Sequence, residues 1–315
     1  GKLDQDLIPS FSLKTRICPS EIHGVFDVKT EPAPLHKSDP RLDTPSDIFK
    51  IGVSKRCKPL LEFPKDIVSL AIQDFSEKVD LYLKPLRSDM SILTESQAIE
   101  GLAIPGYEPM EMTTSEGYPW VLMRPSVASN KSWLFDLEFD HTGRFKVKGL
   151  QSDLRRVLDE KLSNRSEGIV PLTYFTACLK DSRILKSKVS TPGKTRIFEM
   201  SPVDLTIVQR QYFLDFYASY RKCREMEHTI GINPDGEEWT RLADELTHFS
   251  PHILTADYSG YGPSINHTIL NLVINIQIGW LNNQVAFSEV NNRIRHCLKH
   301  EIMHGLHIAR NLVFV

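Results

Sequence analysis

Six basic side chains are concentrated in one short segment of the chain, KDSRILKSKVSTPGKTR, which runs from Lys180 to Arg196 and contains one acid, Asp181. The basic residues are Lys180, Arg183, Lys186, Lys188, Lys194 and Arg196. Residues two apart share a face of an extended strand, so Lys186 and Lys188 are predicted to lie side by side. Lys and Arg neutralise phosphate oxygens and can stabilise a leaving pyrophosphate, which makes this segment a candidate polyphosphate site. On charge alone, a solvated basic hairpin is the simpler explanation.

A second candidate is the segment that ends in Asp257. Residues 252–257 (HILTAD) are predicted to form a short strand, and a glycine-bearing turn (SGYGPS) follows. A carboxylate at the carboxyl end of a strand can hold Mg²⁺ together with main-chain carbonyl oxygens. Taken alone, Asp257 fits an N-cap or turn position better. Together with the basic segment, however, it begins to describe nucleotidyl transfer.

A third constellation fits zinc chemistry. His300, Glu301 and His304 match HExxH, in which two histidines one helical turn apart bind zinc beside a general-base glutamate. His296 and His307 add histidines at near-helical spacing. The pattern is short, no third ligand follows it, and the helix around it is amphipathic. We therefore expect mostly surface or partly buried histidines, and a zinc metallopeptidase remains an alternative function.

The composition is that of an ordinary globular chain. Of its 315 residues, 41% are hydrophobic and 25% are charged, with a formal net charge of −2. This charge excludes a chain that is strongly basic as a whole, but it leaves room for a local basic stripe. No segment has the length and apolarity of a transmembrane span, and residues 1–10 do not form a signal peptide. Membrane association is therefore expected only through partners.

The cysteines are scattered, odd in number and without a CxxC pair. This pattern argues against a disulfide framework or a zinc ribbon and favours a reducing compartment. They are Cys18, Cys57, Cys178, Cys223 and Cys297.

Hydrophobic periodicity predicts the elements that must position these residues. Residues 1–62 are predicted to be irregular, with extended runs at 21–28 and 47–53. Helices are predicted at 67–83, 152–162, 201–216, 237–246, 265–282 and 287–306. A further short helix is predicted to begin at a capping box formed by Thr94 and Gln97. Strands or β-like runs are predicted at 120–123, 133–139, 144–149, 171–179, 252–257 and 307–315.

Several stretches resemble, in the same order, the fingers and early palm of picorna-like viral RNA-dependent RNA polymerases. The order of the stretches is more specific than any one of them. Residues 14–26 and 29–42 resemble the N-terminal strap, 112–120 (MTTSEGYPW) the Thr-Ser-x-Gly-Tyr-Pro stretch, 180–196 the basic motif F, 230–239 the residues before motif A, and 257–262 (DYSGYG) motif A itself.

The resemblance implies an α/β (α+β) right-hand polymerase fold with fingers and a partial palm. It places the strap and fingertips in residues 1–62, the fingers with motif F in 63–200, and a fingers–palm region with motif A in 201–315. The thumb, the Ser-Gly motif B and the Gly-Asp-Asp motif C are absent from these residues. Because two-metal catalysis needs carboxylates on both sides of the ions, this N-terminal fragment is expected to be inactive although its parent polymerises.

The resemblance also assigns roles to individual residues. Asp257 would coordinate the catalytic Mg²⁺, with Mn²⁺ as the alternative ion, and the Tyr258 carbonyl would be a second ligand. The residues expected to contact nucleotide or RNA are Lys180, Arg183, Lys188, Lys194, Arg196 and Gly262. Lys188 and Arg196 are the expected triphosphate contacts, Arg183 departs from the family pattern by one position, and Thr113–Trp120 would lie near the template.

One departure concerns ribose selection. Many relatives carry a second aspartate five residues after the motif A aspartate, which is Asp257 here. This second aspartate belongs to a network that reads the ribose 2′-hydroxyl. Here that position is Gly262, followed by Pro263. A glycine supplies no carboxylate, so ribose selection must be arranged differently. This variant is typical of insect picorna-like viruses of the iflavirus kind.

The implied partners are template and primer RNA, nucleoside triphosphates and other viral replication proteins. The implied location is the host cytoplasm, at membrane-associated replication complexes of a positive-strand RNA virus. A non-catalytic RNA-binding module is a further alternative. It would use the same basic stripe, with Tyr118 and Trp120 as stacking surfaces.

Overall fold

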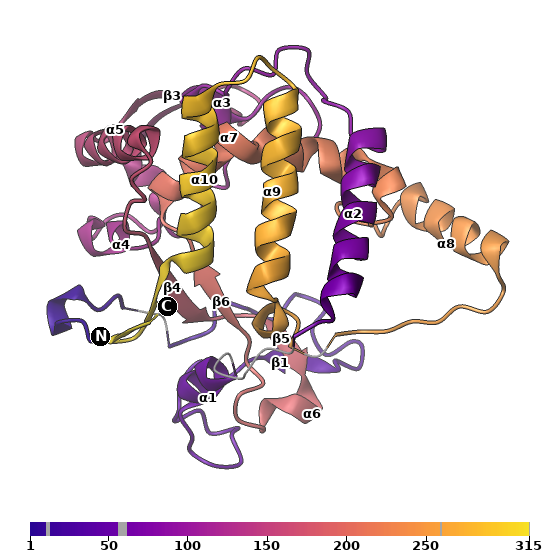
Figure 1. The fold of residues 1–315 in the computed structure, drawn as a ribbon. Helices are drawn as coiled ribbons and strands as arrows, with labels where there is room; N and C mark the ends of the chain where they lie inside the picture. The colour runs from indigo at the N-terminus through magenta and orange to yellow at the C-terminus, as the bar shows by residue number, and fades with distance from the viewer. Residues whose placement is uncertain (11–12, 56–61, 259, 315) are drawn as a thin grey trace. The chain divides into compact units, whose positions relative to one another are not determined.

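The computed structural model describes residues 1–10, 13–55, 62–258 and 260–314, and these fall into two compact units (Figure 1). One unit comprises residues 1–59, 111–209 and 293–315, and the other comprises residues 60–110 and 210–292. All strands in the described part of the chain belong to the first, which we call the β-containing unit. The second is called the helical unit.

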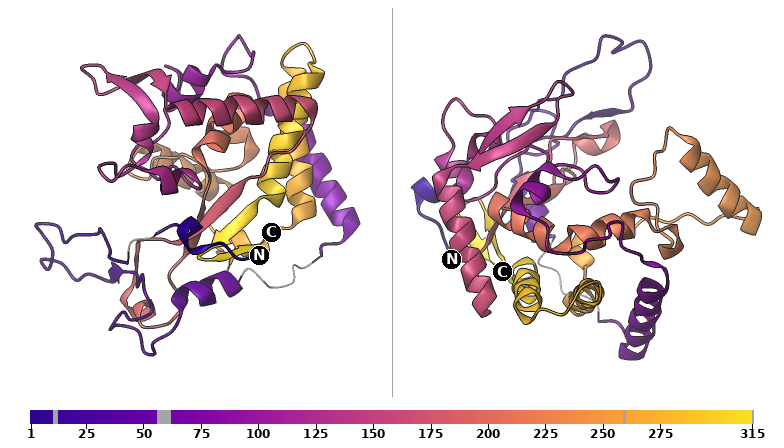
Figure 2. Two further views of the ribbon diagram at one scale, coloured as in Figure 1. Left: turned by 90° about the vertical axis from the view of Figure 1, so that its left-hand side faces the viewer. Right: turned by 90° about the horizontal axis from the view of Figure 1, so that it is seen from above.

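A sheet with the strand order β6-β4-β7-β8 is the centre of the β-containing unit. Its strands are β4 (Tyr174–Leu179), β6 (Ile197–Met200), β7 (Leu306–Ala309) and β8 (Leu312–Phe314). Strand β4 pairs antiparallel with β6 and parallel with β7, and Figure 2 shows β7 and β8, in yellow, beside it. The middle of β4 is buried, as the apolar and β-branched run at 171–179 predicted.

Two small antiparallel sheets complete the strands of this unit. Strand β1 (Thr30–Pro32) pairs with β5 (Arg183–Leu185), and β2 (Phe135–Phe139) pairs with β3 (Phe145–Leu150). The second pair confirms the runs predicted at 133–139 and 144–149.

The helices of this unit include two that were predicted as extended runs. The helices are α1 (Ile48–Ser54), α4 (Trp120–Met123), α5 (Ser152–Glu167), α6 (Lys186–Val189), the first part of α7 (Val203–Lys222) and α10 (Glu289–His304) from residue 293 onward. The extended predictions at 47–53 and 120–123 are wrong. Asp47 caps α1 by accepting the Lys50 N–H at 3.1 Å, and short apolar runs do not distinguish a strand from a helical turn.

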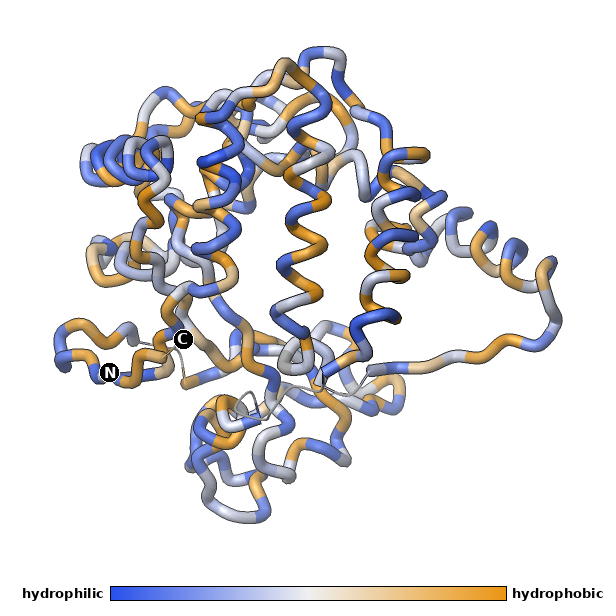
Figure 3. Tube along the Cα trace, viewed as in Figure 1, coloured by the Kyte–Doolittle hydropathy of each residue, from blue (hydrophilic) through white to orange (hydrophobic). Residues whose placement is uncertain are grey.

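The helical unit contains α2 (Lys65–Tyr82), α3 (Glu95–Glu100), α8 (Glu237–Phe249), α9 (His267–Asn283) and the second part of α7. Helix α2 follows Pro64 and α3 carries the Thr94–Gln97 capping box, both as predicted. Helices α2 and α9 lie side by side, and hydrophobic residues recur along α9 (Figures 1 and 3). By contrast, α8 has no buried residue and projects from the rest of its unit (Figure 1).

Two strand predictions near the carboxyl end of the sequence need correction. Residues 252–257 form no strand, because no other segment of the described chain pairs with them and a strand needs a neighbour for its N–H and C=O groups. In the segment predicted as one strand at 307–315, the described residues to 314 form the β7–β8 hairpin instead, with a turn at Arg310, where φ is +58°. The Arg310 guanidinium anchors this turn by bonding the Asp47 carboxylate at 2.6 and 2.9 Å.

Four of the five cysteines lie in the described residues. Cys18 is exposed and Cys178, Cys223 and Cys297 are buried, all as free thiols, whereas Cys57 lies outside the described residues. None of the described helices is long and apolar enough to cross a membrane.

A buried ion pair fastens α5 and α10 to the sheet. Arg165 donates from Nε and Nη2 to the two carboxylate oxygens of Glu301 at 2.6 and 2.9 Å, and both side chains are 0% exposed. The Thr173 hydroxyl donates to the same carboxylate at 2.5 Å, and the Thr173 carbonyl accepts the Leu306 N–H. The pair therefore joins two helices to the starts of β4 and β7.

Removing this carboxylate should destabilise the β-containing unit. We expect Glu301→Ala to lower the free energy of unfolding by about 3–5 kcal/mol, because the Arg165 charge would remain buried without compensation. Urea denaturation measures this change. The matched control is His300→Ala, since His300 is the exposed neighbour on the same helix, and it should change the value by less than about 0.5 kcal/mol. Equal effects of the two substitutions would contradict the structural role of Glu301.

Candidate functional site

The basic segment begins and ends on neighbouring strands. Lys180 follows β4, Arg196 precedes β6, and the Lys180 N–H donates to the Arg196 carbonyl at 2.8 Å, which continues the antiparallel ladder. The ladder therefore brings the first and last cations of the segment together, 16 positions apart in the sequence. All six basic side chains of the segment are exposed.

The interior of the segment differs from the extended strand predicted for it. Strand β5 pairs with β1 only over residues 183–185, and the Lys186 N–H then bonds the Lys29 carbonyl as the chain turns into α6. Lys186 and Lys188 lie in this helical turn, where residues two apart point to different faces. The prediction that they share a strand face is therefore wrong. Burial of Val189 accompanies the turn.

The only acid of the segment is already occupied by Thr15 and Arg16, in the stretch that resembles the N-terminal strap. The Asp181 carboxylate accepts the Thr15 hydroxyl and the Arg16 N–H, both at 2.7 Å. Arg183 is held as well, because its Nε donates to the Thr30 hydroxyl at 2.8 Å. Thr15, Arg16 and Thr30 were not singled out from the sequence, and their place in the strap resemblance was the only signal for them.

Five cations of the segment have no counter-ion within it. Among the described residues, no acidic side chain forms an ion pair with Lys180, Lys186, Lys188, Lys194 or Arg196. Exposed, unpaired cations on one segment create a positive potential that attracts phosphate groups. The solvated hairpin and the polyphosphate site are both compatible with this geometry.

The loop at 112–120 is fixed against the start of α7. The Val203 N–H donates to the Glu116 carbonyl at 2.9 Å, and Gly117, with φ of +75°, lies so close to the Ser201 backbone that a Cβ would collide with it. Burial would raise the pKa of the Glu116 carboxyl, but hydrogen bonds from Arg124 and Trp133 hold it below its usual value. The loop is thus a rigid part of the β-containing unit.

Asp257 belongs to the helical unit and is exposed. Its carboxylate makes no hydrogen bond or ion pair with the rest of the described chain. Tyr258 is 79% exposed, and its ring lies 5.9 Å from that of Tyr261. Ser259, within the same motif, lies outside the described residues. Because the basic segment lies in the other unit, the interpretation that Asp257 acts together with it in nucleotidyl transfer stays a prediction.

The donor set at this position suits a hard cation. Mg²⁺ prefers oxygen ligands and commonly takes one or two carboxylates, with waters and substrate phosphates completing its shell. A solvent-facing carboxylate at Asp257 and the adjacent Tyr258 carbonyl are donors of this kind. No cluster of three or more His, Cys, Asp or Glu side chains suited to a metal occurs in the described ranges. Asp257 and Tyr258 offer oxygen donors of the kind that Mg²⁺ prefers, and their role as metal ligands stays a prediction.

Gly262 opens a short 3₁₀ helix at Gly262–Ser264. A Cβ placed on Gly262 would meet no other atom within 4 Å. Close packing therefore does not explain this glycine, and a larger side chain would fit here.

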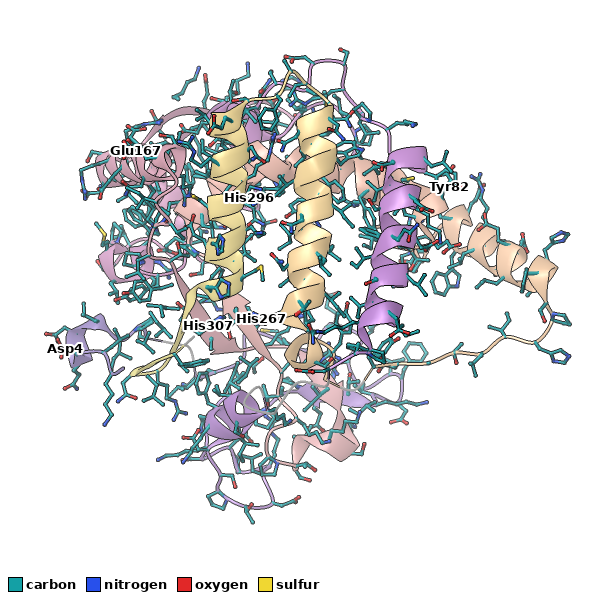
Figure 4. The ribbon with its side chains drawn as sticks, in the orientation of Figure 1. Asp4, Tyr82, Glu167, His267, His296 and His307 are labelled. Carbon is teal, nitrogen blue, oxygen red and sulfur yellow. The ribbon has the colours of Figure 1, made fainter. Side chains whose placement is uncertain are left out.

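The glutamate of the HExxH pattern, Glu301, is not free to act on a substrate. Glu301 is buried in the ion pair with Arg165 and accepts the Thr173 hydroxyl, so it cannot serve as a general base. His300 and His304 are exposed, with their rings stacked 5.6 Å apart. Figure 4 shows His296 in the middle of α10 and His307 beyond its end. The zinc metallopeptidase alternative is therefore wrong.

Comparisons with known proteins agree on one family. Residues 19–308 match the sequence profile named Viral RNA-dependent RNA polymerase. The genome polyprotein of Deformed wing virus is 36% identical over 321 residues, which cover 100% of this chain and 11% of the polyprotein. The genome polyprotein of Rice tungro spherical virus (strain A) is 34% identical, and the match covers 99% of this chain and 9% of the polyprotein. The chain thus spans about a tenth of these relatives.

A solved structure shows the same fold. The Sicinivirus 3Dpol RNA dependent RNA polymerase superposes with a TM-score of 0.71 at 21% identity, covering 96% of this chain and 57% of that one. At this identity the likeness concerns the fold alone. It confirms the expected α/β polymerase architecture.

The exposed cations should make RNA binding sensitive to salt. We expect Lys188→Ala and Arg196→Ala each to weaken binding of single-stranded RNA and to reduce the slope of log K against log[salt] by about 1, the change for one lost phosphate contact. Fluorescence anisotropy at several salt concentrations measures both quantities. Lys146→Ala, which removes an exposed lysine on β3, is the control and should leave the slope unchanged. A slope unaltered in all three variants would contradict a phosphate-binding role.

Proposed function

This chain belongs to the viral RNA-dependent RNA polymerase family, and we propose that it supplies the nucleotide-handling part of an enzyme that copies a positive-strand RNA genome. The observation that carries this proposal is the array of exposed, unpaired cations between Lys180 and Arg196 in a chain of this family. The resemblance to picorna-like polymerases is confirmed, and the similarity to the Deformed wing virus polyprotein supports the narrower iflavirus placement.

The proposed role of the cations is to hold a triphosphate. Lys188 and Arg196 would neutralise its oxygens, and Lys180, which the β4–β6 ladder brings beside Arg196, would add a third charge. Phosphoryl and nucleotidyl transfer depend mainly on positioning and on stabilising charge in the transition state. Lys194 and Arg183 would contact RNA or nucleotide at the rim, with Arg183 oriented by Thr30.

The proposed role of Asp257 is to bind the catalytic metal, with the Tyr258 carbonyl as a second ligand. Mg²⁺, or Mn²⁺ in its place, stabilises the attacking and leaving oxygens of an in-line displacement when it is bound. The reaction would join a primer 3′-hydroxyl to the α-phosphate of the incoming nucleotide and release pyrophosphate. Such a site needs further carboxylates, and the 315 residues contain no Gly-Asp-Asp triplet. We therefore propose catalysis only for the longer polymerase.

The remaining assignments follow from the family. We propose template and primer RNA, nucleoside triphosphates and other viral replication proteins as partners, and the host cytoplasm, at membrane-associated replication complexes, as the location. Residues 1–62 would form the strap and fingertips, 63–200 the fingers, and 201–315 the fingers–palm region.

Asp257→Asn in the longer polymerase should abolish nucleotide incorporation. We expect the rate to fall about a thousandfold or more, because a metal ion supplies several kcal/mol of transition-state stabilisation and each 1.4 kcal/mol is a factor of ten. A primer-extension assay measures the rate. Binding of RNA should be unchanged, which separates a polymerase from a non-catalytic RNA-binding module. The control is Asp244→Asn, an exposed aspartate on α8, which should extend primers normally. Normal extension by the Asp257 variant would refute the metal role.

Gly262→Asp tests ribose selection. The position has open space for the side chain, so the substitution should leave the fold intact. If Gly262 occupies the ribose-reading position, the new carboxylate should change the ratio of kcat/KM for ribonucleotides and 2′-deoxyribonucleotides. The measurement is single-nucleotide incorporation by the longer polymerase. An unchanged ratio would mean that residue 262 does not approach the sugar.

A further inference from the structure

A cavity of about 320 Å³ lies within the β-containing unit, away from the candidate residues of the basic segment. Its walls come from four segments that are far apart in the sequence: the loop at 118–123, helix α5, the start of β4 and the start of α7. The side chains used below are Tyr118, Arg156, Lys161, Leu172, Tyr174 and Asp204.

Aromatic and apolar surfaces form most of the lining. The rings of Tyr118 and Tyr174 lie edge to face, with centroids 5.3 Å apart and planes at 64°. Leu172 stands at the opening and is 62% exposed. Aromatic and apolar walls of this kind suit an aromatic ligand, and the volume is at the small end of the range for ligand sites. The cavity therefore suits one ring system rather than an extended chain.

A buried charged group fixes one side of the cavity. Asp204 is 1% exposed and accepts hydrogen bonds from Trp120 Nε1 and Lys161 Nζ, both at 2.7 Å. An ammonium group has three protons, and this contact uses one of them. Lys161 can therefore donate to a hydrogen-bond acceptor inside the cavity while Asp204 compensates its charge.

The opening carries a second cation. The Arg156 side chain is 65% exposed, and its ion pairs with Asp153 and Glu160 are long, at 3.5 and 3.6 Å. Such exposed pairs contribute little energy, so Arg156 can turn toward an anion at the opening at small cost. An aromatic cavity with one interior donor and one cation at its rim matches a heterocycle joined to a phosphate.

We propose that this cavity binds the base of a nucleotide, with Lys161 donating to a carbonyl of guanine or uracil and Arg156 holding the phosphate. The site is separate from the triphosphate site of the basic segment. It deepens the proposed function and rests on it only for the choice of a nucleotide as ligand. The nucleotide can be free or part of an RNA strand, since both present the same base and phosphate.

The test uses the 315-residue chain with Lys188→Ala and Arg196→Ala, which removes the two triphosphate contacts proposed for the basic segment. Guanosine 5′-monophosphate is titrated and its affinity is measured by ligand-observed NMR. In this background Leu172→Trp should weaken binding about tenfold or more, a change of about 1.4 kcal/mol, because the larger side chain obstructs the opening. Ile169→Trp is the matched control, because Ile169 is 53% exposed and does not line the cavity. It should bind like the background chain.

A second variant removes the charge without filling the cavity. Arg156→Ala should weaken binding about two- to fivefold, as expected for one exposed ionic contact. Arg155→Ala is its control, since Arg155 lies on the same helix, pairs with Asp159 at 3.7 Å and does not line the cavity. It should leave the affinity unchanged. Equal unfolding midpoints of the variants would show that the losses are not due to misfolding.

The two sources of the ligand give different results. If a free nucleotide is the ligand, the monophosphate binds and depends on Leu172 and Arg156. If an RNA strand is the ligand, a short guanosine- and uridine-containing oligonucleotide shows this dependence, and an abasic oligonucleotide does not. Either result supports the site. Ribose 5-phosphate binding as tightly as the monophosphate, or equal affinities in the Leu172 and Ile169 variants for both ligands, would overturn it. None of these readouts depends on Asp257, so the site and the polymerase assignment can fail separately.

Discussion

A buried carboxylate, Glu301, organises the β-containing unit. Burying a charged pair costs desolvation energy, which its geometry must offset, and here two bonds from Arg165 and one from Thr173 satisfy the carboxylate. The pair fixes α5 and α10 relative to β4. Strand β4 in turn leads into Lys180, and α5 carries one wall of the cavity. An interaction with no direct chemical role therefore helps to position Lys180 and the α5 wall of the cavity within this unit.

The described part of the β-containing unit leaves some of its cations without a counter-ion and pairs others directly with an acid. Backbone and hydroxyl groups of the strap occupy the one acid in the basic segment, and Thr30 holds Arg183. The opposite arrangement occurs beside the cavity, where Asp204 compensates Lys161 directly. Uncompensated cations suit a highly charged triphosphate, whereas a compensated lysine suits a neutral base. The two arrangements match the two ligand sites that we propose for this unit.

Long periodic segments and the order of motifs could be predicted from the sequence, whereas short segments could not. Helices α2, α5 and α9 carry apolar faces over several turns, so their existence was clear. Residues 186–189 and 252–257 were predicted wrongly. Segments this short have no clear periodicity of their own, and they adopt the structure that the surrounding chain imposes. The HExxH pattern matched the spacing of a zinc site but could not reveal that Glu301 faces Arg165. The cavity left no sequence signal, since four separate segments build it.

The first residues of the chain have a consequence for solubility. Gly1 and Leu3 exchange backbone hydrogen bonds with Val313 and Asn311, so they run along the outer side of β8. An uncovered sheet edge offers unpaired N–H and C=O groups on which another molecule can add a strand. By covering this edge, three residues with little side-chain packing protect the sheet from intermolecular pairing. Trimming them would leave every functional side chain in place and still make the protein prone to aggregate.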